Sequence, residues 1–91
     1  MYVLSCLVTV CVLGSESLKD KRKVVKSIIE RLKAKFNLSV AEIGLQESRC
    51  DAEIGCAVVS NDPGFAHNVI EAAVRFIESD CRVEVLKIDR I

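Results

Sequence analysis

The twelve residues after Met1, YVLSCLVTVCVL, restrict the possible folds more than any other part of the chain. Apolar and β-branched residues fill this run, and Gly14 follows it, which indicates an extended strand over residues 2–13. Successive side chains of a strand point to opposite faces of a sheet. One face would be entirely apolar: Tyr2, Leu4, Cys6, Val8, Val10 and Val12. The other face mixes apolar and polar residues, so we expect helices to cover the first face and leave the second partly open.

Two helices are predicted from apolar residues at helical spacing and from capping residues. The first is capped by Ser15 or Ser17, and Asp20, three residues after Ser17, resembles the last residue of a capping box with Asp in place of Glu. Asn37 is placed as a left-handed stop. The second begins at Pro63, with Asp62 as its N-cap. The expected buried stripe of the first helix is Leu18, Val25, Ile28, Ile29, Leu32 and Phe36. That of the second is Ala66, Val69, Ile70, Ala73, Val74 and Ile77.

Three further strands are predicted, over Leu38–Gln46, Ile54–Ser60 and Arg82–Ile88. The first two flank the polar sequence ESRCDAE and should form a hairpin. The last strand is expected to place Val83 and Val85 on one face, and Leu86 and Ile88 on the other. The order is therefore βαββαβ. Right-handed crossovers place both helices on one face of a four-stranded antiparallel sheet, an α+β ferredoxin-like domain over residues 1–91.

Positive charge is concentrated in the first helix, although the net charge of the chain is zero. Residues 16–35 hold eight Lys or Arg against three acidic residues, a net of +5, whereas residues 36–91 hold five against ten, a net of −5. Five cations share one sector of the helix that only Glu30 interrupts: Lys19, Arg22, Lys23, Lys26 and Lys33. This sector is either the solvated back of an ordinary helix or a surface that contacts RNA phosphates. Like charges spaced four residues apart, which destabilise a helix slightly, favour a functional role.

Residues for catalysis or metal binding form no recognisable pattern. The cysteines contain no CxxC pair; they are Cys6, Cys11, Cys50, Cys56 and Cys81. This spacing argues against a disulfide framework and against a zinc site. The one histidine, His67, is expected on the polar side of the second helix, without a nucleophile to activate. A weak cation site at the acidic hairpin is the less favoured alternative to a solvated tip. We expect no catalytic residue, no metal, no cofactor and no enzymatic activity.

Two segments carry a resemblance to a known family. SLKDKRKVVKSIIERLKAKFNLSVAEIG, followed by GCAVVSND, resembles the YlxP-like family of small bacterial proteins, a domain of unknown function. The resemblance implies a ferredoxin-like fold and a bacterial cytoplasmic protein, often encoded beside factors for translation initiation and ribosome maturation. It implies no catalytic residues. The chain departs from the family pattern over Gly44 to Ala52, where relatives often carry an aromatic, acidic hairpin.

The first functional hypothesis is a non-enzymatic binding module for ribosomal RNA or a ribosomal subunit, using the five cations of the first helix. An alternative is a self-associating interaction module, a homodimer or higher homo-oligomer, without a nucleic-acid role. Its interface would be the open sheet face, which carries Val3, Leu7 and Cys11. No segment reaches the ~20 apolar residues of a membrane span, so no membrane role is expected and the predicted location is cytoplasmic.

Overall fold

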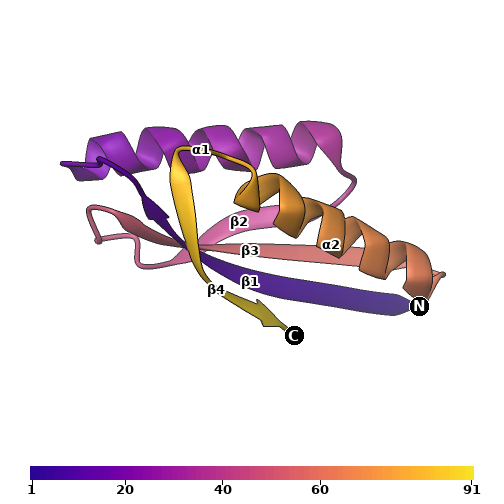
Figure 1. The fold of residues 1–91 in the computed structure, drawn as a ribbon. Coiled ribbons are helices and arrows are strands. Elements are labelled where there is room, and N and C mark those ends of the chain that lie inside the picture. The colour runs from indigo at the N-terminus through magenta and orange to yellow at the C-terminus, as the bar shows by residue number, and fades with distance from the viewer.

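The computed structural model describes all residues from Met1 to Ile91 and has the element order βαββαβ (Figure 1). The elements are β1 (Tyr2–Val12), α1 (Leu18–Lys35), β2 (Ser39–Gly44), β3 (Asp51–Ser60), α2 (Pro63–Glu78) and β4 (Val83–Arg90). The strands form one antiparallel sheet in the order β2-β3-β1-β4. Figure 1 shows α1 and α2 on the same side of this sheet. The fold is ferredoxin-like, which confirms the prediction.

The core lies between the sheet and the two helices, where alternate residues of the central strands meet the apolar stripes. Its fully buried side chains include Val8 and Val10 of β1, Ile54 of β3, Ile28 of α1 and Ile77 of α2. Burying each such side chain contributes about 1.5–3 kcal/mol. The predicted assignment of β1 faces is confirmed for its even-numbered residues from position 6 onward, which are buried.

Of the two candidate N-caps of α1, the structure uses Ser17; Asp62 caps α2 as predicted, and one predicted C-terminal stop is wrong. Ser17 Oγ accepts a hydrogen bond from Asp20 N at 3.1 Å, and Asp62 Oδ1 accepts one from Gly64 N at 2.9 Å. Asn37 does not adopt a left-handed conformation, since Leu45 is the non-glycine residue with positive φ. The helix ends earlier, because its C-cap residue is already extended and leads the chain directly toward β2.

The prediction for the faces of β4 is also wrong in one respect. The register with β1 shifts between Thr9, which pairs with Lys87, and Val10, which pairs with Val85. Leu86 is therefore an extra residue in a bulge, and it is exposed. Because the bulge resets the alternation, Ile88 packs against the core on the same face as Val85 instead of the opposite face.

Candidate functional site

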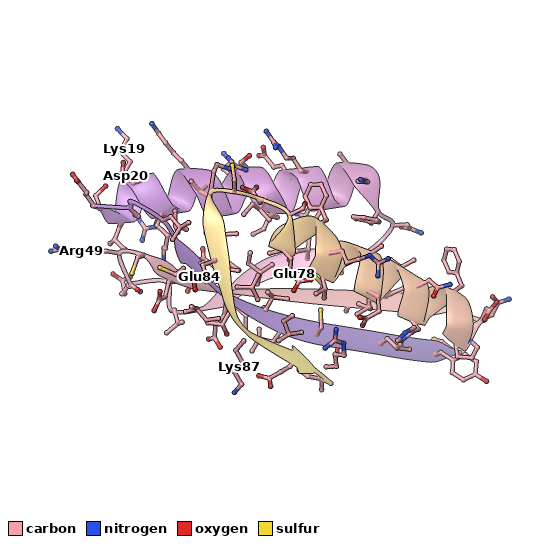
Figure 2. The ribbon with its side chains drawn as sticks, viewed as in Figure 1. Lys19, Asp20, Arg49, Glu78, Glu84 and Lys87 are labelled. Atoms are coloured by element: carbon pink, nitrogen blue, oxygen red, sulfur yellow. The ribbon has the colours of Figure 1, made fainter.

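The five cations predicted to contact RNA form one exposed surface on α1, here called the basic face. Its members are Lys19, Arg22, Lys23, Lys26 and Lys33. All five are exposed, and none forms a salt bridge, although four salt bridges exist elsewhere in the molecule. Figure 2 shows Lys19 at the beginning of α1, pointing away from the sheet. The basic face is therefore a charged surface that no acidic side chain of the chain neutralises by direct contact.

The neighbours of α1 define which way the basic face is turned. Ser27 Oγ accepts a hydrogen bond from Arg82 Nη1 at 3.3 Å, and Lys35 Nζ lies 5.3 Å from the centre of the Phe76 ring on α2. These contacts place one flank of α1 toward α2. At 100° per residue, the cations of the basic face lie on the solvent side and on the other flank. α1 packs over β2, an edge strand of the sheet, so the basic face borders that edge.

One lysine of α1 has a different role, which the charge pattern did not reveal. Lys21 is fully buried. Its Nζ donates hydrogen bonds to the backbone oxygens of Leu45 at 2.9 Å, Gln46 at 3.3 Å and Asp51 at 3.1 Å. The sequence does contain a signal for this burial, because Lys21 lies four residues before Val25, in the middle of the predicted apolar stripe.

The ammonium group of Lys21 holds together the turn between β2 and β3. Glu42 Oε2 lies 3.5 Å from Lys21 Nζ and is itself buried without a hydrogen bond. Leu45, whose carbonyl binds Lys21, has a φ of 60°. The acidic group predicted around the hairpin is therefore divided, because Glu42 points to the helix side while Glu47 is exposed in the turn.

Two cysteines that are far apart in the sequence meet at the far end of β1. The Sγ atoms of Cys11 and Cys50 and a carboxylate oxygen of Asp51 all lie within 4.8 Å of one another. Partial burial, together with hydrogen bonding to Cys50 and Asp51, raises the pKa of the Cys11 thiol to about 11. The two thiols meet because strand pairing places β1 beside the residues that precede β3.

A second cysteine pair lies inside the core. Cys6 and Cys56 are direct partners in the register of β1 and β3, and both are buried free thiols. The hydrogen bond between them lowers the pKa of Cys6 and raises that of Cys56, and burial raises the latter further. The remaining cysteine, Cys81, is exposed at the turn before β4.

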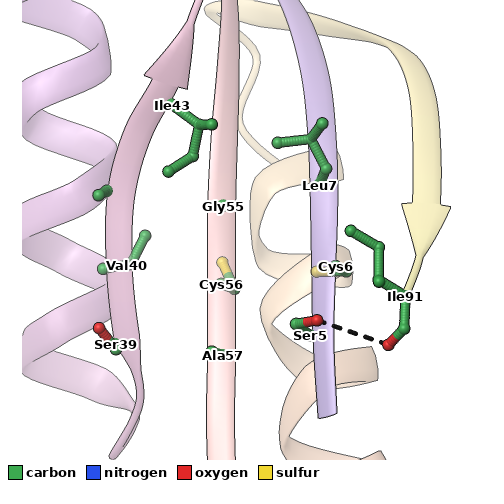
Figure 3. A pocket seen from close by; sticks show the side chains of 11 residues that line it. Ser5, Cys6, Leu7, Ser39, Val40, Ile43, Gly55, Cys56, Ala57 and Ile91 are labelled. Atoms are coloured by element: carbon green, nitrogen blue, oxygen red, sulfur yellow. Dashed lines mark hydrogen bonds between the residues drawn. The ribbon is translucent and has the colours of Figure 1, made fainter.

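The residues predicted for an oligomer interface all lie on the open face of the sheet, but each has different surroundings. Val3 pairs with Val59 and is exposed, whereas Cys11 pairs with Asp51 in a polar region. Leu7 borders a shallow apolar hollow of about 330 Å³. Figure 3 shows this hollow over Gly55, with side chains of Leu7, Ile43 and Ile91 around it.

Two further features bear on the functional predictions. His67 is exposed on α2. Neither helix combines the length and the apolar character that crossing a membrane requires.

Comparisons with known proteins identify relatives of this chain. The model of a family described as "Protein of unknown function (DUF503)" matches residues 3–90. The uncharacterized protein YlxP of Bacillus subtilis (strain 168) is 37% identical over 68 residues, which cover 75% of this chain and 74% of the relative. The family match runs from β1 to the end of β4 and includes the whole of α1.

Proposed function

Because the chain belongs to the DUF503 family of proteins of unknown function, its task must be argued from its residues, and we propose that it is a non-enzymatic RNA-binding module. The basic face of α1 contacts phosphates, and ribosomal RNA within a ribosomal subunit is the partner to test first. The observation that carries this proposal is that five exposed cations share one helix face and none forms a salt bridge.

The charge distribution supports phosphate contacts rather than sequence reading. Lysine and arginine side chains that meet phosphates release bound counterions, so affinity falls with salt. Five contacts predict a slope of about −3.5 in log affinity against log salt for single-stranded RNA. The open sheet face offers no aromatic stacking platform, since Tyr2, the one aromatic residue on a strand, belongs to the β1 face that is turned toward the helices. Recognition would therefore depend on the shape and charge of the RNA more than on its bases.

Binding to isolated ribosomal subunits across a salt series tests this proposal. The variant Lys23→Glu/Lys26→Glu reverses two charges in the basic face, and Arg75→Glu/Lys87→Glu makes the same change of net charge elsewhere. Arg75 is exposed on α2, and Figure 2 shows Lys87 pointing away from the helices. We expect the first variant to bind weakly with a shallower salt slope and the second to bind like the wild type. If both variants lost the same affinity for the subunits, net charge alone would explain the effect, and this result would contradict a defined binding site.

A second proposed role is self-association through the open sheet face, with a second copy of this chain as the occupant. Four aliphatic side chains are largely exposed there: Val3 at 58%, Ile43 at 59%, Val59 at 65% and Ile91 at 80%. At about 4.8 Å between strands and 3.3 Å per residue, a four-stranded face of ten residues covers roughly 600 Å². This is close to the ~800 Å² that each partner contributes to a stable interface. The hollow over Gly55 would receive aliphatic side chains of an identical face across a two-fold axis.

Sedimentation velocity over a concentration series tests this second role. Val59→Lys places a charge within the exposed aliphatic region, and Phe65→Lys places one on a similarly exposed residue of α2. We expect the wild type and the Phe65 variant to sediment as a dimer, and the Val59 variant as a monomer. A monomeric wild type at all concentrations would exclude this role and leave the RNA proposal untouched.

A further inference from the structure

Three potential metal ligands meet at the end of β1, although Cys11 precedes Cys50 by 39 residues and Asp51 by 40. Cys11 is paired with Asp51 in the register of β1 and β3, so both side chains are on the open face. Cys50 is brought alongside by the hydrogen bond from Val12 N to Cys50 O at 2.7 Å. The two sulfur atoms and one carboxylate oxygen lie within 4.8 Å of one another, and Cys50 Sγ is 3.5 Å from Asp51 Oδ1.

These separations are close to those of a tetrahedral metal site. A zinc–sulfur bond of about 2.3 Å gives a distance of about 3.8 Å between two sulfur ligands at tetrahedral angles. Small side-chain rotations would bring the three donor atoms to that distance. Two thiolates with one carboxylate favour zinc and similar cations, whereas calcium and magnesium prefer oxygen ligands alone.

The backbone that carries two of the ligands is held in place by other residues. Ser48 Oγ accepts hydrogen bonds from Cys50 N at 3.4 Å and from Asp51 N at 3.0 Å. On the opposite side, the buried Lys21 Nζ binds the carbonyl oxygen of Asp51 at 3.1 Å. Cys50 and Asp51 are therefore positioned by supporting contacts, as the ligands of metal sites commonly are.

A fourth ligand is available on the neighbouring strand. Cys11 is paired on its other side with Glu84 of β4, so the carboxylate of Glu84 extends from the same face of the sheet. Glu84 is exposed and forms no salt bridge. It is therefore free to turn toward the three donor atoms, or to leave the fourth position to water.

We propose that Cys11, Cys50 and Asp51 bind a divalent cation of the zinc class, with Glu84 or water as the fourth ligand. This site is separate from the basic face, and neither proposed role depends on it. It also differs from the sequence-based expectation of no metal, because the ligands come from strands whose adjacency the cysteine spacing does not reveal.

Titration of the reduced full-length protein with cobalt(II) in the absence of oxygen tests the proposal, followed by displacement with zinc. Thiolate–cobalt charge-transfer absorption should appear and saturate at one cobalt per chain, and zinc should remove it. Cys50→Ser and Cys11→Ser should each abolish this absorption. Cys81→Ser, which removes an exposed thiol outside the cluster, should leave it unchanged. Ser48→Ala keeps all ligands but loses their support, and should weaken binding by about 10- to 100-fold.

Circular dichroism of each variant separates loss of ligands from loss of folding. If the Cys11→Ser variant does not fold, the Cys50→Ser variant alone tests the proposal. Its substitution does not alter a strand, because Cys50 precedes β3 and lies outside the strands. Absence of charge-transfer absorption in the wild type would overturn the proposal. Equal absorption in the Cys50→Ser and Cys81→Ser variants would overturn it as well.

Discussion

The ammonium of Lys21 lies 3.5 Å from the carboxylate of Glu42, beneath the first turns of α1. This ion pair joins the most basic element of the chain to its acidic hairpin. Lys21 is fully buried and also binds two backbone carbonyls of the β2–β3 turn and that of the first residue of β3, whereas Glu42 has only Lys21 as a charged partner. One of the eight cations of residues 16–35 therefore has a structural role, and the exposed ones remain available to a partner.

Replacement of Lys21 by methionine should strongly destabilise the fold. The change leaves the buried Glu42 carboxylate without a partner and three carbonyls without a donor, and breaking a buried pair in this way costs about 3–5 kcal/mol. The free energy of unfolding in urea measures the effect. Lys23→Met, an exposed change in the same helix, should alter stability by about 0.5 kcal/mol or less. Similar losses in both variants would contradict a structural role for Lys21.

Replacement of Leu45 by glycine should stabilise the protein. Leu45 has a φ of 60°, in the left-handed region, which costs about 1–2 kcal/mol for a residue with a Cβ atom. Glycine removes this cost but loses more conformational entropy on folding, so we expect a net gain of about 1 kcal/mol at most. Thermal unfolding gives the comparison. Leu45→Ala is the control, because it removes the same side-chain contacts and retains the strain. A glycine variant no more stable than the alanine variant would argue against strain at this turn.

Four of the five thiols should react with an alkylating reagent in a defined order. Cys81 is exposed and should react first, whereas the buried Cys6 and Cys56 should react only on unfolding. Cys11 is partly exposed, but its pKa of about 11 keeps the nucleophilic thiolate scarce at pH 8, so it should react at least about tenfold more slowly than Cys81. Its rate should rise as the pH approaches 11. Mass spectrometry of peptides after timed quenching measures each site, and early labelling of Cys56 would contradict the core packing.

Asp80 should contribute to stability in a pH-dependent manner. Arg82 donates to it from Nε at 3.0 Å and from Nη2 at 2.7 Å, and this hydrogen bonding lowers the pKa of Asp80 below its ordinary value of 3.8. A lowered folded-state pKa means that the contribution is present above pH 3.8 and is lost as the pH falls through the folded-state value. The difference in unfolding free energy between wild type and Asp80→Asn should therefore be constant near pH 6 and shrink below pH 3.8. A difference that grows in acid would contradict this assignment.

Several features of the fold and the candidate sites followed from local patterns. Alternation in β1 and helical spacing in α1 and α2 predicted the elements, because both periods are properties of the backbone itself. Ser17 and Asp62 predicted the starts of the helices, because a cap is a contact within one turn. The basic face was equally predictable, since its members share one helix and need no other element to bring them together.

The features that depend on contacts between distant segments could not be predicted from local sequence patterns. The bulge at Leu86 moves Ile88 to the core face through a register that only pairing with β1 defines. Cys11 meets Cys50 because two strands lie side by side, and no spacing rule for cysteines covers that case.

The order of the elements, their caps and the separation of charge between α1 and the rest of the chain follow from the sequence alone, because these depend on interactions within a few residues. Which charged and thiol groups meet depends on the tertiary structure. Lys21 is buried because the β2–β3 turn closes over it, and its carbonyl partners lie 24 to 30 residues further along the chain. Contacts of that kind arise from strand pairing and helix packing, where burial and geometry act between segments that share no local pattern.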